Sequence, residues 1–292
     1  MNIIIGFLIF CIVLFFYLHI YFQLKTSNDL EVFEIEQPAK EKHEEICDLR
    51  QPILFPFNND KMVDLCNRKT ISDSYAAFDV KIRTIEQSDD DDDTKDLYSL
   101  ISLKESIKIV EEDKGGKYLV ENNNDFLEET EIIKIFKAND MFLRPYMMFS
   151  SQYDFLMASK NTKTPLRYEI NFRNYFLVTE GEIKVKLSPP KSSKYLYKIT
   201  DYENMEFRSP VNPWDVQPQY KADFDKIKCI ETTIKKGQIL FIPAYWWYSF
   251  EFGENSSICT FKYRTFMNSL AISDKIIMKF LQLQNVKRNI LN

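Results

Sequence analysis

The segment ILFIPAYWWYSFEF, residues 239–252, carries the strongest fold signal in this chain. An apolar run leads into a proline, after which two tryptophans and two tyrosines stand almost side by side. Side chains alternate between the two faces of a strand, so one face is expected to hold Trp246, Tyr248, Phe250 and Phe252. The rest of the chain determines whether this cluster lines a site or fills a core.

Composition narrows the class of protein. The chain has 292 residues, of which 45% are hydrophobic and 15% aromatic, enough for one folded domain with appendages. The net charge is −5 and the lysines are scattered, so no basic patch suggests nucleic-acid binding. There are only two histidines, which restricts the metal chemistry open to the chain.

The N-terminus predicts a membrane anchor. Residues 3–22 contain no formal charge and are long enough as a helix to cross the hydrocarbon core of a bilayer. A cleaved signal peptide is the alternative, but the apolar run is long and no Ala-x-Ala-like site follows it. We therefore expect residues 1–22 to be a retained single-pass anchor in contact with lipid. Only Lys25 flanks it closely, so the side of the membrane is not predicted.

Composition also divides the rest of the chain. Residues 23–45 are polar and charged and are expected to form a juxtamembrane linker, and the acidic run SDDDDDTKD at 88–96 is expected to form a solvated surface loop. A folded domain is predicted over 46–267, followed by a C-terminal helix over 268–292. The apolar stripe of that helix is expected to pack on its own domain, with pairing to a second copy as the alternative.

Short strands dominate the chain after residue 166. Turn residues such as Gly181 and Gly237 separate several of them, which predicts an all-β sandwich or barrel. The expected strands are LRYEINF, YFLVTEG, EIKVKLS, KYLYKI, KCIETTI, QILFIP, WWYSFEF and SICTFKYR. Outside the predicted anchor, the cysteines have no spacing typical of a disulfide framework or zinc site, so isolated thiols are expected at Cys47, Cys66, Cys229 and Cys259.

Two of these segments carry a family resemblance. RNYFLVTEGEIKVKLSPP (173–190) and KKGQILFIPAYWW (235–247) resemble the two halves of a JmjC-type or cupin-like barrel. The likeness covers roughly residues 46–267. In finer detail, TPLRYEINFRNYF, SPVNPW and PAYWWYSFEF look most like membrane-anchored cupin-like proteins of large DNA viruses.

The resemblance implies a double-stranded β-helix, or jelly roll, with flanking α-helices. Active members of the family are Fe(II)- and 2-oxoglutarate-dependent hydroxylases or demethylases, in which two histidines and one carboxylate hold the iron. Aligned without a gap, the two upstream ligand positions of the family are Tyr168 and Ile170. Shifted by one residue, they are Arg167 and Glu169, and the distal histidine position is Tyr248.

The resemblance therefore implies that the iron ligands are missing. His19 lies in the predicted anchor and His43 in the predicted linker, where a solvated position is expected, so neither should reach the barrel. No catalytic residue, metal or cofactor is expected, and Fe(II) and 2-oxoglutarate binding are disfavoured. An atypical metal site from Tyr248 and Glu169 is the alternative, although the fixed charge of Arg167 opposes it.

Side chains at the vacated positions are expected to face the barrel mouth. A buried guanidinium needs a partner, so Arg167 is expected to pair with Glu169 or Tyr248 as a structural plug. The alternative is a pocket that presents polar groups to an anionic ligand, with Arg167, Glu169, Asn174, Lys184, Trp246 and Tyr248 as its candidate residues. In the proline-rich loop 209–220, Trp214 and Tyr220 are expected to anchor the loop to the domain or to a partner.

Three functions follow from these patterns. The favoured one is a membrane-anchored, non-catalytic cupin-like scaffold or binding module. The alternatives are an oxygenase with an atypical metal set and a metal-free barrel that binds a small molecule.

Overall fold

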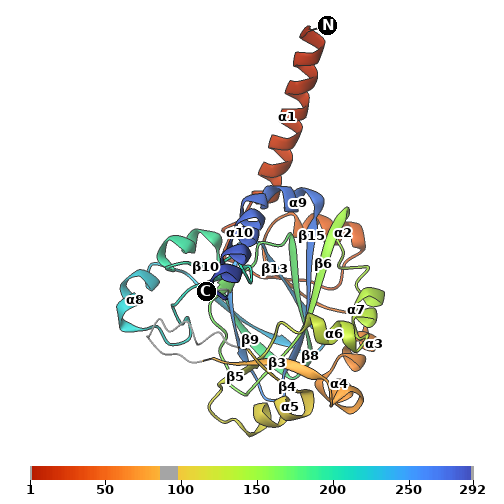
Figure 1. Cartoon of the computed structure of the whole chain (residues 1–292), viewed down its shortest axis with the longest axis vertical. Coiled ribbons are helices and arrows are strands. Elements are labelled where there is room, and N and C mark those ends of the chain that lie inside the picture. The colour runs from red at the N-terminus through yellow and green to blue at the C-terminus, as the bar shows by residue number, and fades with distance from the viewer. Residues whose placement is uncertain (1, 86–97, 291–292) are drawn as a thin grey trace.

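Alternation of apolar and polar residues builds two β-sheets in the computed structural model, which describes residues 2–85 and 98–290 (Figure 1). Strand β9 (Glu182–Ser188) is a clear example, because Ile183, Val185 and Leu187 are buried while Lys184 is exposed. Such a strand packs one face on a core and turns the other to solvent.

The larger sheet has nine strands among the described residues. Only the β1–β2 pairing is parallel. Its order is β1 (Phe33–Glu34), β2 (Ile53–Pro56), β13 (Gln238–Pro243), β8 (Arg173–Glu180), β15 (Ser257–Thr265), β6 (Met148–Ala158), β5 (Tyr118–Val120), β3 (Asp79–Thr84) and β4 (Ser99–Ser102).

The smaller sheet has six described strands, all antiparallel to their neighbours. Its order is β10 (Ile199–Asp201), β11 (Glu206–Arg208), β7 (Arg167–Tyr168), β14 (Trp247–Phe252), β9 and β12 (Ile230–Lys235). The strands β6 to β9 alternate between the two sheets along the chain, and β12 to β15 do so again.

A shared core joins the two sheets. Phe176 of β8 and Leu240 of β13 pack in one apolar cluster with Val185 of β9 and Phe250 of β14. Side chains from the inner faces of both sheets therefore interdigitate. A second cluster lies on the other face of the nine-stranded sheet, which explains why nearly every residue of β8 is buried.

Helices cover the outer faces of both sheets. The cluster behind the nine-stranded sheet includes side chains from α2 (Lys40–Cys47), α3 (Asp60–Leu65), α4 (Arg68–Tyr75), α5 (Leu103–Glu112), α6 (Asn124–Glu129) and α7 (Ile133–Asn139). The outer face of the six-stranded sheet is covered by α8 (Pro218–Phe224) and α10 (Ser273–Ile290), while α9 (Phe266–Ala271) follows β15.

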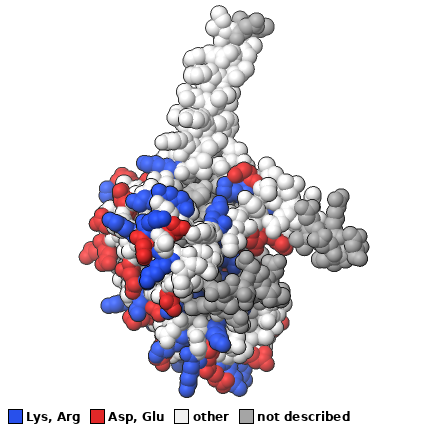
Figure 2. All heavy atoms as spheres, turned by 90° about the vertical axis from the view of Figure 1, so that its left-hand side faces the viewer, with Lys and Arg blue, Asp and Glu red and all other residues white. Residues whose placement is uncertain are grey.

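Helix α1 (Asn2–Leu24) projects from one end of the domain (Figure 1). Within Ile3–Leu24, the most apolar stretch of 18 residues has a mean hydropathy of 2.9, and none of that stretch is buried in the protein. Its surface carries no charged side chain in Figure 2. By length and composition it can cross a bilayer, a property that an N-terminal signal sequence shares.

Residues 23–45 differ from the expected linker. Strand β1 pairs with β2, and α2 begins at Lys40 and buries His43 completely. The polar composition favours a linker because most residues of this segment are exposed. Strand β1 is only two residues long, and the charged face of α2 points to solvent.

Three other expectations need comment. The segment KYLYKI at 194–199 is not a strand, because a 3-10 helix over Pro190–Tyr195 begins at a proline and β10 starts only at Ile199. The acidic run at 88–96 lies outside the described residues. In α10, Ile276 packs on the domain, whereas Ile277 and Phe280 are exposed, so the predicted stripe is only partly covered.

Candidate functional site

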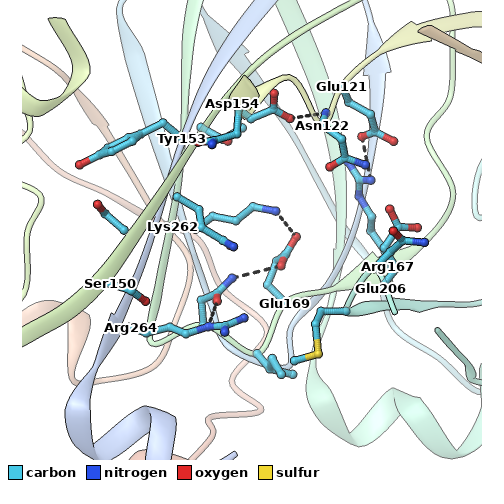
Figure 3. Close-up of a pocket in the computed structure, with 18 of the residues that line it drawn as sticks. Glu121, Asn122, Ser150, Tyr153, Asp154, Arg167, Glu169, Glu206, Lys262 and Arg264 are labelled. Atoms are coloured by element: carbon cyan, nitrogen blue, oxygen red, sulfur yellow. Dashed lines mark hydrogen bonds and ion pairs between the residues drawn. The ribbon is translucent and has the colours of Figure 1, made fainter. Parts of the chain in front are cut away.

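A cavity of about 910 Å³ opens at one end of the space between the sheets. Strands β6 and β15 line one side, and the segment from β7 to β8 lines the other (Figure 3). Its polar side chains include Glu121, Asp154, Arg167, Glu169, Lys262 and Arg264. This is a cavity of a size typical for small-molecule sites, but its lining is unusually charged.

Arg167 is held at the inner end of this cavity by a buried ion pair. Its Nη1 donates to Glu121 Oε2 over 2.9 Å, and its guanidinium lies 5.6 Å from the ring centre of Tyr248. The Arg83 guanidinium also pairs with Glu121. Burial alone would raise the pKa of Glu121, but the two guanidiniums outweigh burial and lower that pKa to about 2. Glu121 is therefore a carboxylate between two fixed cations.

Glu169 forms the second polar group of the cavity. Tyr248 Oη donates to Glu169 Oε1 over 3.0 Å, and Lys262 Nζ donates to the same oxygen over 2.7 Å. Burial opposes ionisation of Glu169, yet Lys262 lowers the net pKa of the carboxyl. Burial and the Glu169 carboxylate raise the pKa of Tyr248 well above its usual value, so the phenol stays protonated.

The observed partners of Arg167 differ in part from the expected ones. Arg167, Glu169 and Tyr248 do converge, because β7 pairs with β14 and sets Arg167 opposite Tyr248. The ion-pair partner of Arg167 is Glu121 rather than Glu169, and the cation on Glu169 is Lys262. Glu121 lies 46 residues before Arg167, so no local pattern could reveal the pair.

The neighbouring candidates Tyr168 and Ile170 border the cavity but belong to another packing cluster. The Tyr168 ring stacks on Phe207 at 5.0 Å and meets Trp247 edge-on at 4.8 Å. Ile170 is buried in the same cluster on the outer side of the six-stranded sheet. Their side chains supply packing rather than donors to the cavity.

Three other pocket candidates lie elsewhere. Trp246 is fully buried in the core between the sheets, where its indole donates to Arg50 O over 3.1 Å. Asn174 is also buried, and its amide donates to Ile242 O over 3.1 Å. Lys184 lies on the outer face of β9 and pairs with Glu251 at 3.5 Å. None of these three side chains is among those that line this cavity, although Asn174 also accepts from Asn171, which does line it.

The loop candidates anchor the chain to its own domain. The Trp214 indole donates to Ser249 Oγ over 2.8 Å, and Lys186 Nζ lies 4.6 Å from a Trp214 ring centre. Tyr220 packs beside the Trp247 cluster, 5.0 Å from the Tyr197 ring. Both residues already have intramolecular contacts.

Two charged side chains of the cavity, Arg264 and Asp154, form no ion pair with another described residue, although Asp154 accepts three backbone N–H groups. Arg264 Nε donates to Asn171 Oδ1 over 2.6 Å, but no carboxylate among the described residues forms an ion pair with Arg264. Burial lowers the pKa of this guanidinium. Asp154 accepts the backbone N–H groups of Asn122 and Asn123, each over 2.7 Å, and burial raises its pKa to about 6.

The position of His43 is a correction. It is fully buried rather than solvated, with Nε2 2.9 Å from Tyr175 Oη. Tyr175 points into the cluster behind the nine-stranded sheet, whereas its neighbour Phe176 points into the core between the sheets. His43 is thus separated from the cavity by the sheet itself.

The geometry agrees with a comparison to known families. A model of the cupin-like domain family matches residues 24–265. The chain belongs to the cupin-like family. The match begins more than twenty residues before the expected domain start, in keeping with the strand and helix found there.

The cavity does not fit the iron centre that the cupin-like oxygenases imply. Among the described residues, no three His, Cys, Asp or Glu side chains gather in a way that could hold a metal ion. Glu169 already accepts from Lys262 and Tyr248, the phenol is protonated, and Arg167 adds a fixed positive charge. Such a set offers Fe(II) neither imidazole nor a free carboxylate.

Proposed function

We propose that this cupin-like protein is a non-catalytic, metal-independent binding module held at a membrane by α1. The observation that supports it is the pairing of side chains at the positions where the family resemblance expects iron ligands. Glu169 is bonded to Tyr248 and Lys262, and Arg167 is paired with Glu121. These groups are paired with one another, so binding a metal would require several buried hydrogen bonds and ion pairs to break.

We further infer that the two sheets form a double-stranded β-helix. Support comes from the strands β6 to β9 and β12 to β15, which alternate between the sheets in two successive rounds. The same interior that holds iron in active relatives would then hold the Glu121–Arg167 and Glu169–Lys262 pairs. The finer resemblance to cupin-like proteins of large DNA viruses favours a virally encoded module.

The ligand that suits the cavity is a small polar molecule with an acidic group. Arg264 presents a planar fork of donors, and no carboxylate of the described chain pairs with it. Lys262 on the same face of β15 adds a second positive charge beside its partner Glu169, while Asp154 supplies acceptor oxygens for hydroxyl or amino groups. A carboxylate or phosphate on Arg264, with polar groups beyond it, would satisfy the lining.

The test is ligand-induced thermal stabilisation of the full chain in detergent, screened with small carboxylates and phosphates. A ligand that binds only the native state stabilises it by about 2.7 kcal/mol at 100 times its Kd. We expect saturable stabilisation by at least one acid. Arg264→Met should abolish it, whereas Lys184→Met, which removes a cation outside the cavity, should leave it unchanged.

Two outcomes would contradict the ligand proposal. One is a screen in which no carboxylate or phosphate stabilises the protein in a saturable way. The other is a stabilising acid whose effect is equal in the unsubstituted protein and in Arg264→Met, since that acid would bind elsewhere.

A further inference from the structure

Exposed apolar side chains gather near the base of α1. Tyr146, Met147, Phe149 and Phe266 are between 58% and 82% exposed, values that are high for large hydrophobic residues. We call these four residues the apolar collar. Each lies outside the core clusters and has a large surface without protein cover among the described residues.

Pairing of strands brings the collar together at one end of the domain. Met148 at the start of β6 pairs with Thr265 at the end of β15, so the two chain segments meet there. The rings of Phe149 and Phe266 are 6.2 Å apart. Helix α9, which begins at Phe266, packs against α1 at the end from which α1 projects (Figure 1).

The junction between α1 and the domain is packed. Gln23, in the last turn of α1, is buried. The Phe22 ring lies 5.2 Å from the Arg50 guanidinium, whose other neighbour is the Phe172 ring at 4.5 Å. These contacts fix the direction of α1 relative to the collar. A bilayer that surrounds α1 would therefore have a defined position relative to the collar as well.

Helix length sets that level. Ile3–Leu24 has 22 residues, which at about 1.5 Å per residue span about 33 Å, close to the hydrocarbon thickness of about 30 Å. The hydrocarbon boundary then falls near the last turn of α1. The headgroup layer extends roughly 5–7 Å further on each side, which is where a helix packed on that turn would lie.

We propose that the apolar collar lies in the headgroup layer of the same bilayer that α1 crosses. The proposal rests on the membrane anchoring proposed above. Aromatic side chains are favoured at this interface, because their rings are apolar and, in tyrosine, the hydroxyl reaches water. Continuity with α1, which has no protein cover over its most apolar 18 residues, identifies lipid as the occupant rather than a second protein. The bilayer would then fix the orientation of the cavity.

Depth-dependent fluorescence quenching tests the proposal on the full chain in phosphatidylcholine vesicles with brominated acyl chains. Phe266→Trp and Phe149→Trp place reporters in the collar. Leu100→Trp is the matched control, because Leu100 is 66% exposed and lies on β4 at the far end from α1 (Figure 1). The unsubstituted protein supplies the background of its three native tryptophans.

We expect the emission of the tryptophan introduced into the collar to shift to shorter wavelength and to be quenched most by bromines near the headgroups. The Leu100→Trp emission should show neither effect. Collar reporters quenched no more than Leu100→Trp would overturn the proposal. So would a blue shift that appears only at high protein density, since this would indicate a second copy as the occupant.

A reporter within α1 separates failure of the collar from failure of the anchor. Val13→Trp lies near the middle of α1 and should be quenched by deep bromines. If Val13→Trp is quenched and the collar reporters are not, the anchor stands and the collar proposal is wrong. If none is quenched, the membrane anchoring itself is wrong, and the collar proposal falls with it.

Discussion

Glu121 is the residue on which the inner charge pairs of the cavity depend. It accepts from Arg167 over 2.9 Å and also pairs with Arg83, with both guanidiniums largely buried. Removing the carboxylate would leave two cations in a region from which water is largely excluded. Removing one partner of a buried ion pair lowers stability strongly, because it leaves an unpaired charge in the interior. Replacing the whole pair by apolar residues costs much less.

The substitution Glu121→Gln should therefore destabilise the fold strongly. We expect the free energy of unfolding to fall by about 3 kcal/mol or more, since the buried guanidiniums lose their counter-charge. Chemical denaturation of the full chain in detergent measures the change. Lys184→Met, which breaks an exposed pair with Glu251, should cost no more than about 1 kcal/mol. Equal costs for both substitutions would contradict the account.

His43 provides a pH dependence whose sign is defined. Burial, followed by the charges of Arg173 and Lys40, lowers its pKa to about 3 from 6.5. Between these two pKa values the unfolded chain binds a proton at His43 and the folded chain does not. The free energy of unfolding is therefore highest above about pH 6.5 and decreases as the pH falls toward 3. The imidazole is neutral in the folded protein at neutral pH.

The His43→Gln variant should remove this dependence. Between about pH 7 and about pH 5 the His43 contribution to the free energy of unfolding should fall by about 2 kcal/mol in the unsubstituted protein. Denaturation curves at a series of pH values measure the slope, and the variant should have a flatter one. Parallel slopes for both proteins would show that His43 titrates normally, as a solvated side chain does.

Single residues also show what the sequence could and could not indicate. Arg167, Glu169 and Tyr248 were expected to meet, because family resemblance places their segments side by side. Glu121 and Lys262 were missed, since long-range partners leave no local pattern. His43 was misjudged because its charged neighbours face solvent while the imidazole faces the core.

At the scale of elements, the turn between β8 and β9 is tightly constrained. Gly181 has a φ of +71°, and a Cβ there would lie 2.9 Å from Glu254 O and from Ser256 Cα. Gly237, in the turn between β12 and β13, has a φ of +82° but no atom within 4 Å of such a Cβ. Both turns need a residue in the left-handed backbone conformation, but only at Gly181 does neighbouring backbone leave no space for a side chain.

The two alanine substitutions should therefore differ. Gly237→Ala should cost about 1 kcal/mol, the strain of a left-handed residue with a side chain. Gly181→Ala should cost at least about 1 kcal/mol more, because backbone of the β14–β15 turn must move as well. Thermal or chemical unfolding of both variants measures the difference. A Gly181→Ala cost equal to or below that of Gly237→Ala would be inconsistent with the close approach described here.

Strand prediction succeeded for β9, β14 and β15 but missed β6. Strand β9 alternates clearly, whereas β14 is an almost fully buried aromatic strand, and the sequence predicts both. Strand β6 was missed, because Ser150, Gln152 and Asp154 line the cavity and place polar residues where apolar ones usually point inward. The polar cavity side thus concealed β6, whereas β15, which lines the same cavity, is predicted from the sequence.

At the scale of the whole molecule, the apolar collar and the cavity lie next to each other. Helix α1 ends against α9, next to the apolar collar, while the cavity lies between the sheets with polar groups from β6, β7 and β15. Phe149 belongs to the collar and also borders the cavity. Contact with a bilayer would therefore reach the edge of the ligand site.

The central claim, that paired side chains have replaced the iron centre of the family, has a direct test. The full chain is incubated without oxygen with ferrous iron and 2-oxoglutarate, separated from free metal, and analysed for iron. We predict far less than one iron per chain, with no change in Glu169→Gln. One retained iron per chain that is lost in Glu169→Gln would contradict the account.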